Sequence, residues 1–149
     1  MKGTGVVTSP NHPNFYPHNL NKTEIIEVES GKILRLEFTH FAVHTCGDIT
    51  TCPCDFLKII DGDGTTLMDN SCGYFSYDPS HSWYFLPPII TTRSNRVEIF
   101  FHTDGYGTDT GWSLSWSALT PGEKVLMLNS SRIYHPFDLN LNFDISIAT

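Results

Sequence analysis

The sequence predicts an all-β protein, an antiparallel sandwich of about eight to ten short strands. Apolar and polar residues alternate in several segments, as they do along strands with one buried face. Glycine, proline, asparagine and aspartate separate these segments, as expected for turns. No stretch has the spacing of an amphipathic helix of useful length. The high aromatic content (13%) and low charged content (17%) argue for a packed domain and against a disordered chain.

In the N-terminal part, residues 3–20 begin with a short strand and continue as a loop, because three prolines prevent regular ladder pairing there. These prolines are Pro10, Pro13 and Pro17. Alternation predicts strands at 23–29 and 33–41, which the turn at Ser30-Gly31 would join as a hairpin. The apolar face of the second strand is expected to point into the core. It consists of Leu34, Leu36 and Phe38.

In the middle of the chain, a cysteine-rich loop at 42–54 precedes a strand at 55–61. The sequence Asp61-Gly62-Asp63-Gly64 then predicts a tight turn and a return strand at 65–69. Residues 74–88 are aromatic and rich in Ser, Asp and Pro, and give no clear assignment. Further strands are predicted at 89–92, 96–103 and 112–116.

Pro121-Gly122 predicts a boundary, with one domain at 1–120 and a C-terminal extension at 121–149. Residues 138–147 alternate strictly, so this segment needs a sheet to cover its apolar face. It would be an added strand of the sandwich, the start of a following segment, or a strand that pairs with another molecule and makes the chain oligomeric.

Charge and motifs exclude several function classes. The net charge is −7 and there is no basic run, so we expect no nucleic acid partner. No apolar run is long enough to span a membrane. The sequence contains no nucleophile elbow, P-loop or H-E-x-x-H motif, so we predict no enzymatic activity. His40 and His102 lie within predicted strands and are interpreted as packed or surface histidines.

Four cysteines predict two disulfides. Zinc is the weaker alternative, because Cys52-Pro53-Cys54 is a C-x-C and not a C-x-x-C pair. The residues alone leave the pairing open. Sequons at Asn21 and Asn129 predict glycosylation and agree with secretion.

Several motifs, in chain order, resemble those of CUB domains. They are SPNHPNFYP at 9–17, GKILRLEFTHF at 31–41, CPCDFLKI at 52–59, CG at 72–73, and TD at 103–104 followed by GW at 111–112. The resemblance covers about residues 3–119. It implies a two-sheet jelly-roll sandwich in a secreted or cell-surface protein.

The resemblance also implies a disulfide pattern. By spacing from Gly31, Lys22 and Glu24 stand where the family has a cysteine and a tryptophan, so the first family disulfide is absent. The second family disulfide would be Cys52–Cys72. Cys46 and Cys54 would then form a bridge that is peculiar to this chain.

Many CUB domains bind calcium, and the resemblance implies Asp55 and Asp104 as ligands with Tyr16 in support. A basic side chain of the partner would then meet these acids. His44 stands at the position of the family's glutamate, and the backbone at Gly105 and Tyr106 offers only carbonyl oxygens. Asp48 is a candidate replacement carboxylate, completing the predicted site: Asp55, Asp104, Asp48, Tyr16, His44, Gly105 and Tyr106.

Two alternatives require no metal. Calcium takes six to eight oxygen ligands, so two carboxylates would bind it weakly. His44 could instead form a charge-assisted hydrogen-bonded cluster with Asp55 and Asp104. In the simplest alternative, these aspartates only tie loops together by accepting backbone hydrogen bonds.

The sequence therefore predicts an extracellular, non-enzymatic recognition module that binds a protein partner through its end loops, with calcium as a candidate cofactor. One alternative is a carbohydrate-binding module, in which the aromatic residues at 74–77 and 83–85 would contact sugars rather than fill the ends of the sandwich. The other is a structural or oligomerisation domain that assembles through residues 138–147.

Overall fold

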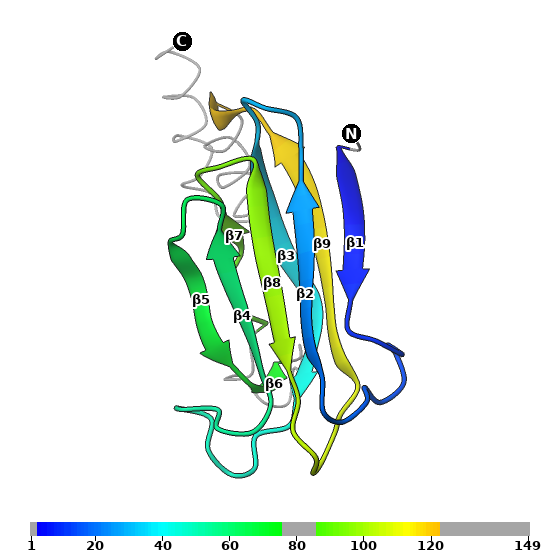
Figure 1. The fold of residues 1–149 in the computed structure, drawn as a ribbon. Helices are drawn as coiled ribbons and strands as arrows, with labels where there is room; N and C mark the ends of the chain where they lie inside the picture. The colour runs from blue at the N-terminus through cyan, green and yellow to red at the C-terminus, as the bar shows by residue number, and fades with distance from the viewer. Residues whose placement is uncertain (1–2, 76–85, 123–149) are drawn as a thin grey trace, which may run out of the picture.

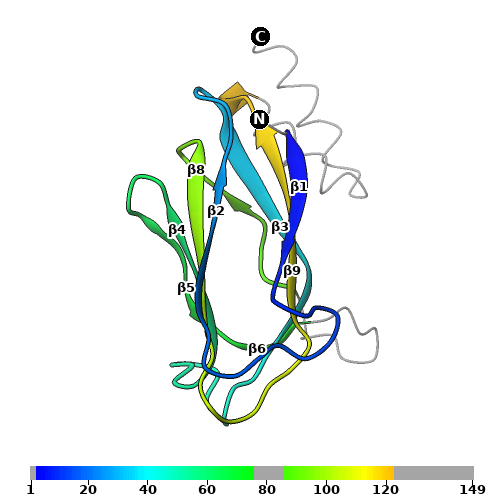
Figure 2. The same cartoon turned by 45° about the vertical axis from the view of Figure 1, so that its right-hand side comes forward.

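The structure, a computed structural model, describes residues 3–75 and 86–122. These residues contain nine strands arranged in two facing sheets (Figures 1 and 2). The strands are β1 (Thr4–Thr8), β2 (Asn21–Glu27), β3 (Ile33–Val43), β4 (Phe56–Asp61), β5 (Thr66–Ser71), β6 (Gly73–Phe75), β7 (Ile90–Thr91), β8 (Arg96–His102) and β9 (Gly111–Leu119). The predicted all-β, two-sheet sandwich is confirmed.

All strand pairs are antiparallel. One sheet has the order β1-β9-β3-β6, with β7 also paired to β3, and the other has the order β2-β8-β4-β5. The predicted C-terminal strand at 138–147 and the sequon at Asn129 lie outside the described residues. Within the described part of the chain, no helix is long and apolar enough to cross a bilayer.

The core lies between the two sheets. Ile59 of β4 is directly opposite Ile99 of β8, and both are fully buried. The predicted core face of β3 is confirmed, since Leu34, Leu36 and Phe38 are at most 2% exposed. Burying each such side chain contributes roughly 1.5–3 kcal/mol to stability.

A β-bulge in β3 changes the phase of the alternation. The register with β9 shifts between Phe38 and His40, so Thr39 is an extra residue. Strict alternation along β3 would place Phe41 on the face opposite Phe38. In the structure Phe41 is instead 1% exposed, and its ring packs edge-to-face against that of Phe38 with centroids 5.3 Å apart. One inserted residue reverses the side-chain pattern beyond it.

The predicted hairpin between 23–29 and 33–41 is wrong, because β2 pairs with β8 and β3 pairs with β9. The Ser30-Gly31 turn instead carries the chain from one sheet to the other. Gly31 has φ +88°, a conformation that glycine adopts without steric cost. The predicted turn at 61–64 does form a hairpin, between β4 and β5.

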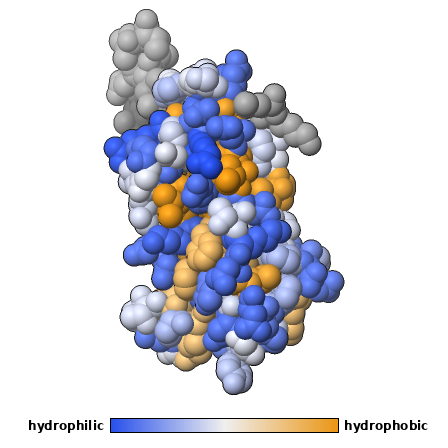
Figure 3. Space-filling view, viewed as in Figure 1, coloured by the Kyte–Doolittle hydropathy of each residue, from blue (hydrophilic) through white to orange (hydrophobic). Residues whose placement is uncertain are grey.

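The two sheets present neighbouring edge strands, β1 and β2, with a shallow groove between them lined by Val6, Ile25 and Trp116. Across the visible face, apolar surface is interspersed with hydrophilic residues (Figure 3). Lys22 and Glu24 are opposite Phe101 and Ile99 in the β2–β8 ladder and pair with each other at 2.9 Å, with 48% and 34% of their side chains exposed. Charged side chains on an edge strand discourage further strands from adding to it.

The disulfides are Cys46–Cys54 and Cys52–Cys72, as the family resemblance implied. Cys52 and Cys72 are 1% and 3% exposed and belong to the hydrophobic core. They fix the cysteine-rich loop to the segment between β5 and β6. Cys46 and Cys54 both lie in the loop between β3 and β4, so the other bridge closes only the loop itself.

We expect the two bridges to differ in their effect on stability. Replacing Cys52 and Cys72 by alanine opens a loop with a sequence separation of 20 and should lower the free energy of unfolding by at least about 3 kcal/mol, because buried sulfur packing is also lost. Replacing Cys46 and Cys54 opens a separation of 8, with an expected loss of about 2.5 kcal/mol at most. Urea denaturation of both double variants would measure this, and an equal loss would contradict it.

Candidate functional site

Three loops meet at one end of the sandwich, the lower end in Figure 1: residues 9–20, 44–55 and 103–110. Backbone hydrogen bonds join the first loop to the third. The Tyr16 N–H donates to the carbonyl of Asp109 at 3.0 Å, and the Asn19 N–H donates to the carbonyl of Asp104 at 2.9 Å. The chain ends of several strands are thereby held in one cluster.

The Asp55 carboxylate connects all three loops. It lies immediately before β4 and is 0% exposed. The Tyr16 hydroxyl donates to its Oδ2 at 2.7 Å, and the Asp104 N–H donates to its Oδ1 at 2.9 Å. The same tyrosine oxygen accepts the His44 N–H at 2.9 Å. The structure thus brings together Asp55, Tyr16, His44 and Asp104, as predicted from the sequence.

Burial dominates the electrostatics of this cluster. It raises the pKa of the Asp55 carboxyl, while the hydrogen bonds from Tyr16 and Asp104 offset part of that effect. Burial also raises the pKa of the Tyr16 phenol, so the tyrosine stays a donor to Asp55. Because a buried carboxylate is costly without a cation, positive charge reaching Asp55 would stabilise its ionised form.

Asp104 differs from Asp55 in that its side chain is partly exposed. Its Oδ1 accepts the Tyr106 N–H at 2.9 Å, which closes a turn within the loop. Its own N–H, rather than its carboxylate, contacts Asp55. At the surface, an incoming cation would therefore meet the partly exposed Asp104 before the fully buried Asp55.

His44 packs against Gly107. A Cβ at position 107 would lie 2.4 Å from Cε1 of the His44 ring, so the imidazole occupies the space a side chain would need. Nδ1 of His44 is buried and has no hydrogen-bond partner among the described residues. The histidine contributes its backbone N–H to the site, and this Nδ1 does not form the predicted charge-assisted bond to Asp55 or Asp104.

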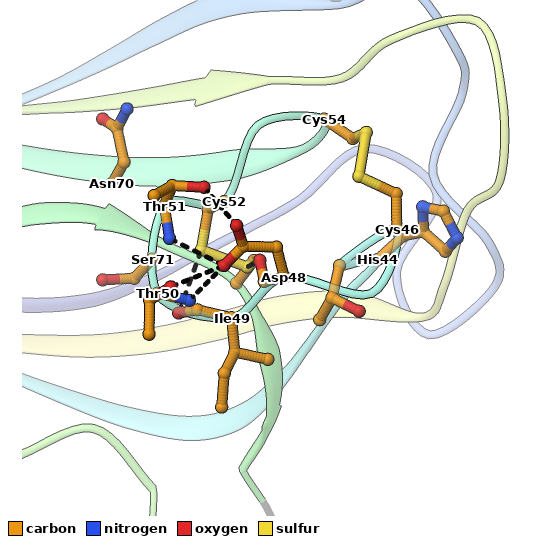
Figure 4. Close-up of a disulfide and its surroundings, with 12 residues drawn as sticks. His44, Cys46, Asp48, Ile49, Thr50, Thr51, Cys52, Cys54, Asn70 and Ser71 are labelled. Carbon is orange, nitrogen blue, oxygen red and sulfur yellow. Dashed lines mark hydrogen bonds between the residues drawn. A yellow bond between two sulfur atoms is a disulfide. The ribbon is translucent and has the colours of Figure 1, made fainter.

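The Asp48 carboxylate is held by hydrogen bonds from the neighbouring Thr50 and Thr51 (Figure 4). Its Oδ1 accepts the backbone and hydroxyl hydrogens of Thr50 and the Thr51 N–H, and its Oδ2 accepts the Thr51 hydroxyl. These bonds lower the pKa of Asp48 and hold it within its own turn. No group of three or more His, Cys, Asp or Glu side chains in the described ranges is placed to hold a metal. The expectation that Asp48 replaces the missing glutamate is therefore wrong.

The residues present are a poor fit to a complete calcium shell. Asp55 and Asp104 supply the side-chain oxygens, and the backbone around Gly105 and Tyr106 can add carbonyls. His44 offers only nitrogen, a poor ligand for a hard cation that prefers six to eight oxygens. The set can attract a cation electrostatically but lacks the charge for tight calcium binding.

The comparisons with known proteins agree with this geometry. The family model described as the CUB domain matches residues 1–116. The chain belongs to the CUB domain family. Over 116 residues it is 31% identical to cubilin from Rattus norvegicus, and this match covers 78% of this chain and 3% of cubilin. It is 34% identical over 116 residues to mannan-binding lectin serine protease 1 from Homo sapiens, covering 77% of this chain and 15% of that protein.

Solved CUB structures share the fold. The MASP-1 CUB2 domain bound to Ca²⁺ has a TM-score of 0.65 and 31% identity, covering 78% of this chain and 93% of that one. The CUB1-EGF-CUB2 domain of human MASP-1/3 has a TM-score of 0.67 and 34% identity, covering 79% and 40%.

Family membership confirms the predicted secreted or cell-surface location, since cubilin and mannan-binding lectin serine protease 1 are secreted or cell-surface proteins. CUB domains are non-catalytic modules for protein interaction, and the protease activity of the MASP-1 relatives lies elsewhere in their chains. The chain spans only a small part of these relatives.

Sequence reasoning missed a second cluster at this end, formed by His12, His40 and Thr110. These residues are far apart in the chain, and His40 reaches the cluster only because of the bulge at Thr39.

Within the predicted aromatic surface, Tyr74 is 58% exposed, whereas Trp83, Tyr84 and Phe85 lie outside the described residues. Glycosylation at Asn21 stays a prediction; its side chain is exposed and accepts from Nδ1 of His102 at 2.7 Å.

Tyr16→Phe tests the central hydrogen bonds. It leaves the His44 N–H and Asp55 Oδ2 without the hydroxyl between them, so we expect the free energy of unfolding to fall by about 1–3 kcal/mol. Tyr106→Phe is a matched control at an 83% exposed tyrosine and should change it by less than about 0.5 kcal/mol. Urea unfolding at neutral pH measures both, and equal values for the two variants would refute the role of the buried hydroxyl.

Proposed function

We propose that this CUB domain is an extracellular recognition module that binds a protein partner through its three end loops, with a basic side chain of the partner approaching Asp104 and Asp55. The observation that carries the proposal is the Asp55 carboxylate, which is fully buried and accepts the backbone N–H of the partly exposed Asp104. Burial raises the pKa of this carboxyl. A lysine or arginine would supply the positive charge that this pair lacks.

The charge of the loops supports a basic partner. The three loops contain four aspartates and no lysine or arginine. The aspartates are Asp48, Asp55, Asp104 and Asp109. Such a concentration of one sign of charge attracts an oppositely charged surface and speeds association.

Exposed apolar side chains support a protein rather than a small basic molecule as the partner. Each loop projects one: Phe15 is 61% exposed, Ile49 is 70% exposed and Tyr106 is 83% exposed. Aromatic side chains beside charged groups are typical of the residues that dominate binding energy at protein interfaces. The exposed loop tips would thus surround the acidic site with apolar contacts.

A calcium-dependent version of this contact is the second candidate, favoured by the similarity to a MASP-1 domain that was solved with Ca²⁺. Asp55 and Asp104 would hold the ion, and it would supply positive charge at the surface of the loops. Because only two carboxylates are available, binding would be in the millimolar range of weak extracellular sites.

The proposed contact predicts the effect of Asp104→Asn. The asparagine amide keeps an acceptor for the Tyr106 N–H but removes the negative charge. A binding partner would first be identified on an array of extracellular protein domains. The affinity of the domain for that partner should then fall about tenfold or more in the variant. Asp63→Asn, an exposed aspartate in the β4–β5 turn at the other end of the sandwich, is the control and should leave affinity unchanged. Equal affinity of Asp104→Asn and the unchanged chain would disprove the assignment.

Calcium titration by calorimetry tests the second candidate. We expect at most a weak signal at millimolar calcium, abolished by Asp55→Ala and Asp104→Asn. As a readout independent of heat, bound calcium would lower the pKa of Asp55, measurable by carboxyl NMR. Absence of both signals would remove calcium from the proposal while leaving the basic contact intact.

Carbohydrate binding and assembly through residues 138–147 stay predictions, because the residues that would carry them are largely outside the described ranges. A glycan array tests the first. Light scattering of the chain with and without residues 122–149 tests the second.

A further inference from the structure

Two histidines from separate segments meet on one threonine. Nδ1 of His12, in the N-terminal loop, lies 2.8 Å from the Thr110 carbonyl oxygen, and Nε2 of His40, in β3, lies 2.7 Å from the Thr110 hydroxyl. The two imidazole rings are tilted, with centroids 5.0 Å apart. Thr110 is the last residue of the 103–110 loop, so this contact fastens that loop both to the N-terminal loop and to β3.

Among the described residues, the charged and titratable groups around the pair are few. From the 103–110 loop, Asp109 faces His40; it is 8% exposed, and its Oδ1 accepts the Thr110 N–H at 2.7 Å. From β6, Tyr74 is hydrogen-bonded to Asp109, which raises the pKa of this tyrosine to about 12. From β9, the residue paired with His40 is the uncharged Ser113. Within residues 3–75 and 86–122, Asp109 is therefore the carboxylate that favours a positive charge on His40.

We propose that His12, His40 and Thr110 form an acid-sensitive clamp, which holds the 103–110 loop closed at neutral pH and loosens it when His40 becomes protonated. The uncharged imidazole of His40 tolerates its partly buried position and the close ring of His12, whose centroid lies 5.0 Å away. A positive charge on His40 is disfavoured there by burial and by His12, and Asp109 offsets only part of that cost. Separation of the two segments returns His40 to solvent and relieves the cost.

The direction of the pH effect follows from the environment of His40. Burial, and secondly the neighbouring His12, lower the pKa of His40, with Asp109 offsetting part of the effect. A histidine whose pKa is lower in the closed state than in the open state stabilises the closed state at pH values above its ordinary pKa of about 6.5. That stabilisation is lost as the pH falls through the lower, closed-state pKa. The clamp therefore opens in acid and not in base.

Asp104 lies on the loop that the clamp fastens. If this loop contacts the partner, which rests on the proposed function, acidification would weaken the contact by loosening the loop that carries Asp104. A CUB domain carrying this clamp would hold its partner at extracellular pH and release it in an acidified compartment.

The clamp itself can be tested without a partner. Hydrogen exchange of the full chain should be followed by mass spectrometry at about pH 7.5 and about pH 5.5, with rates corrected for intrinsic exchange. We expect amide exchange in residues 103–112 to increase severalfold at the lower pH. In His40→Gln the increase should disappear, because the glutamine amide can still bond to the Thr110 hydroxyl but cannot acquire a charge.

A second variant guards against misfolding of the first. In His12→Gln, the pKa of His40 measured by NMR should rise, because one of the causes that lowers it has been removed; a merely structural role would not change it. His18→Gln, at an exposed histidine of the same loop, is the control. The clamp is refuted if exchange in 103–112 is independent of pH, if His40→Gln keeps the full pH response, or if His12→Gln leaves the pKa of His40 unchanged.

Discussion

The hydrogen bonds of the buried Asp55 carboxylate hold the loop end of this sandwich together. One oxygen fixes Tyr16 of the N-terminal loop and the other fixes the backbone of Asp104. Through the tyrosine hydroxyl the same carboxylate also orders His44. Two disulfides restrain the loop that carries Asp55, and one of them lies in the hydrophobic core. A single charged group, fixed to the rigid part of the domain, thus sets the relative positions of all three loops.

In the proposed function, Asp55 combines a structural role with a recognition role. A neutral acceptor that only tied loops together would be buried at lower cost than a carboxylate. Asp55 instead places a carboxyl group against the backbone of Asp104, at an end of the domain that has no lysine or arginine in its loops. The loops are therefore held in place by a group that is itself short of a positive partner. Binding of a cation would strengthen the loop structure rather than disturb it.

The sequence predicted the sandwich and the core of β3 because alternation is a local signal, whereas the grouping of Tyr16, His44, Asp55 and Asp104 followed from the resemblance to CUB domains. It did not predict the pairing of β2 with β8, since a turn such as Ser30-Gly31 can join strands within one sheet or between two. It also missed the bulge at Thr39, which no single residue type marks. The assignment of Asp48 failed because the Thr50 and Thr51 groups that capture its carboxylate compete with any distant partner.

The packing of the His44 ring against Gly107 links two positions that are distant in the sequence. An amino acid with a Cβ at 107 collides with the imidazole, and a shorter side chain at 44 would leave an empty space beside the glycine. Neither position can therefore vary alone without a packing penalty. A carboxylate side chain at 44 would add oxygen ligands to this loop end but would fill the space beside Gly107 differently, so gain of a metal site in such a domain would carry a packing cost at the glycine.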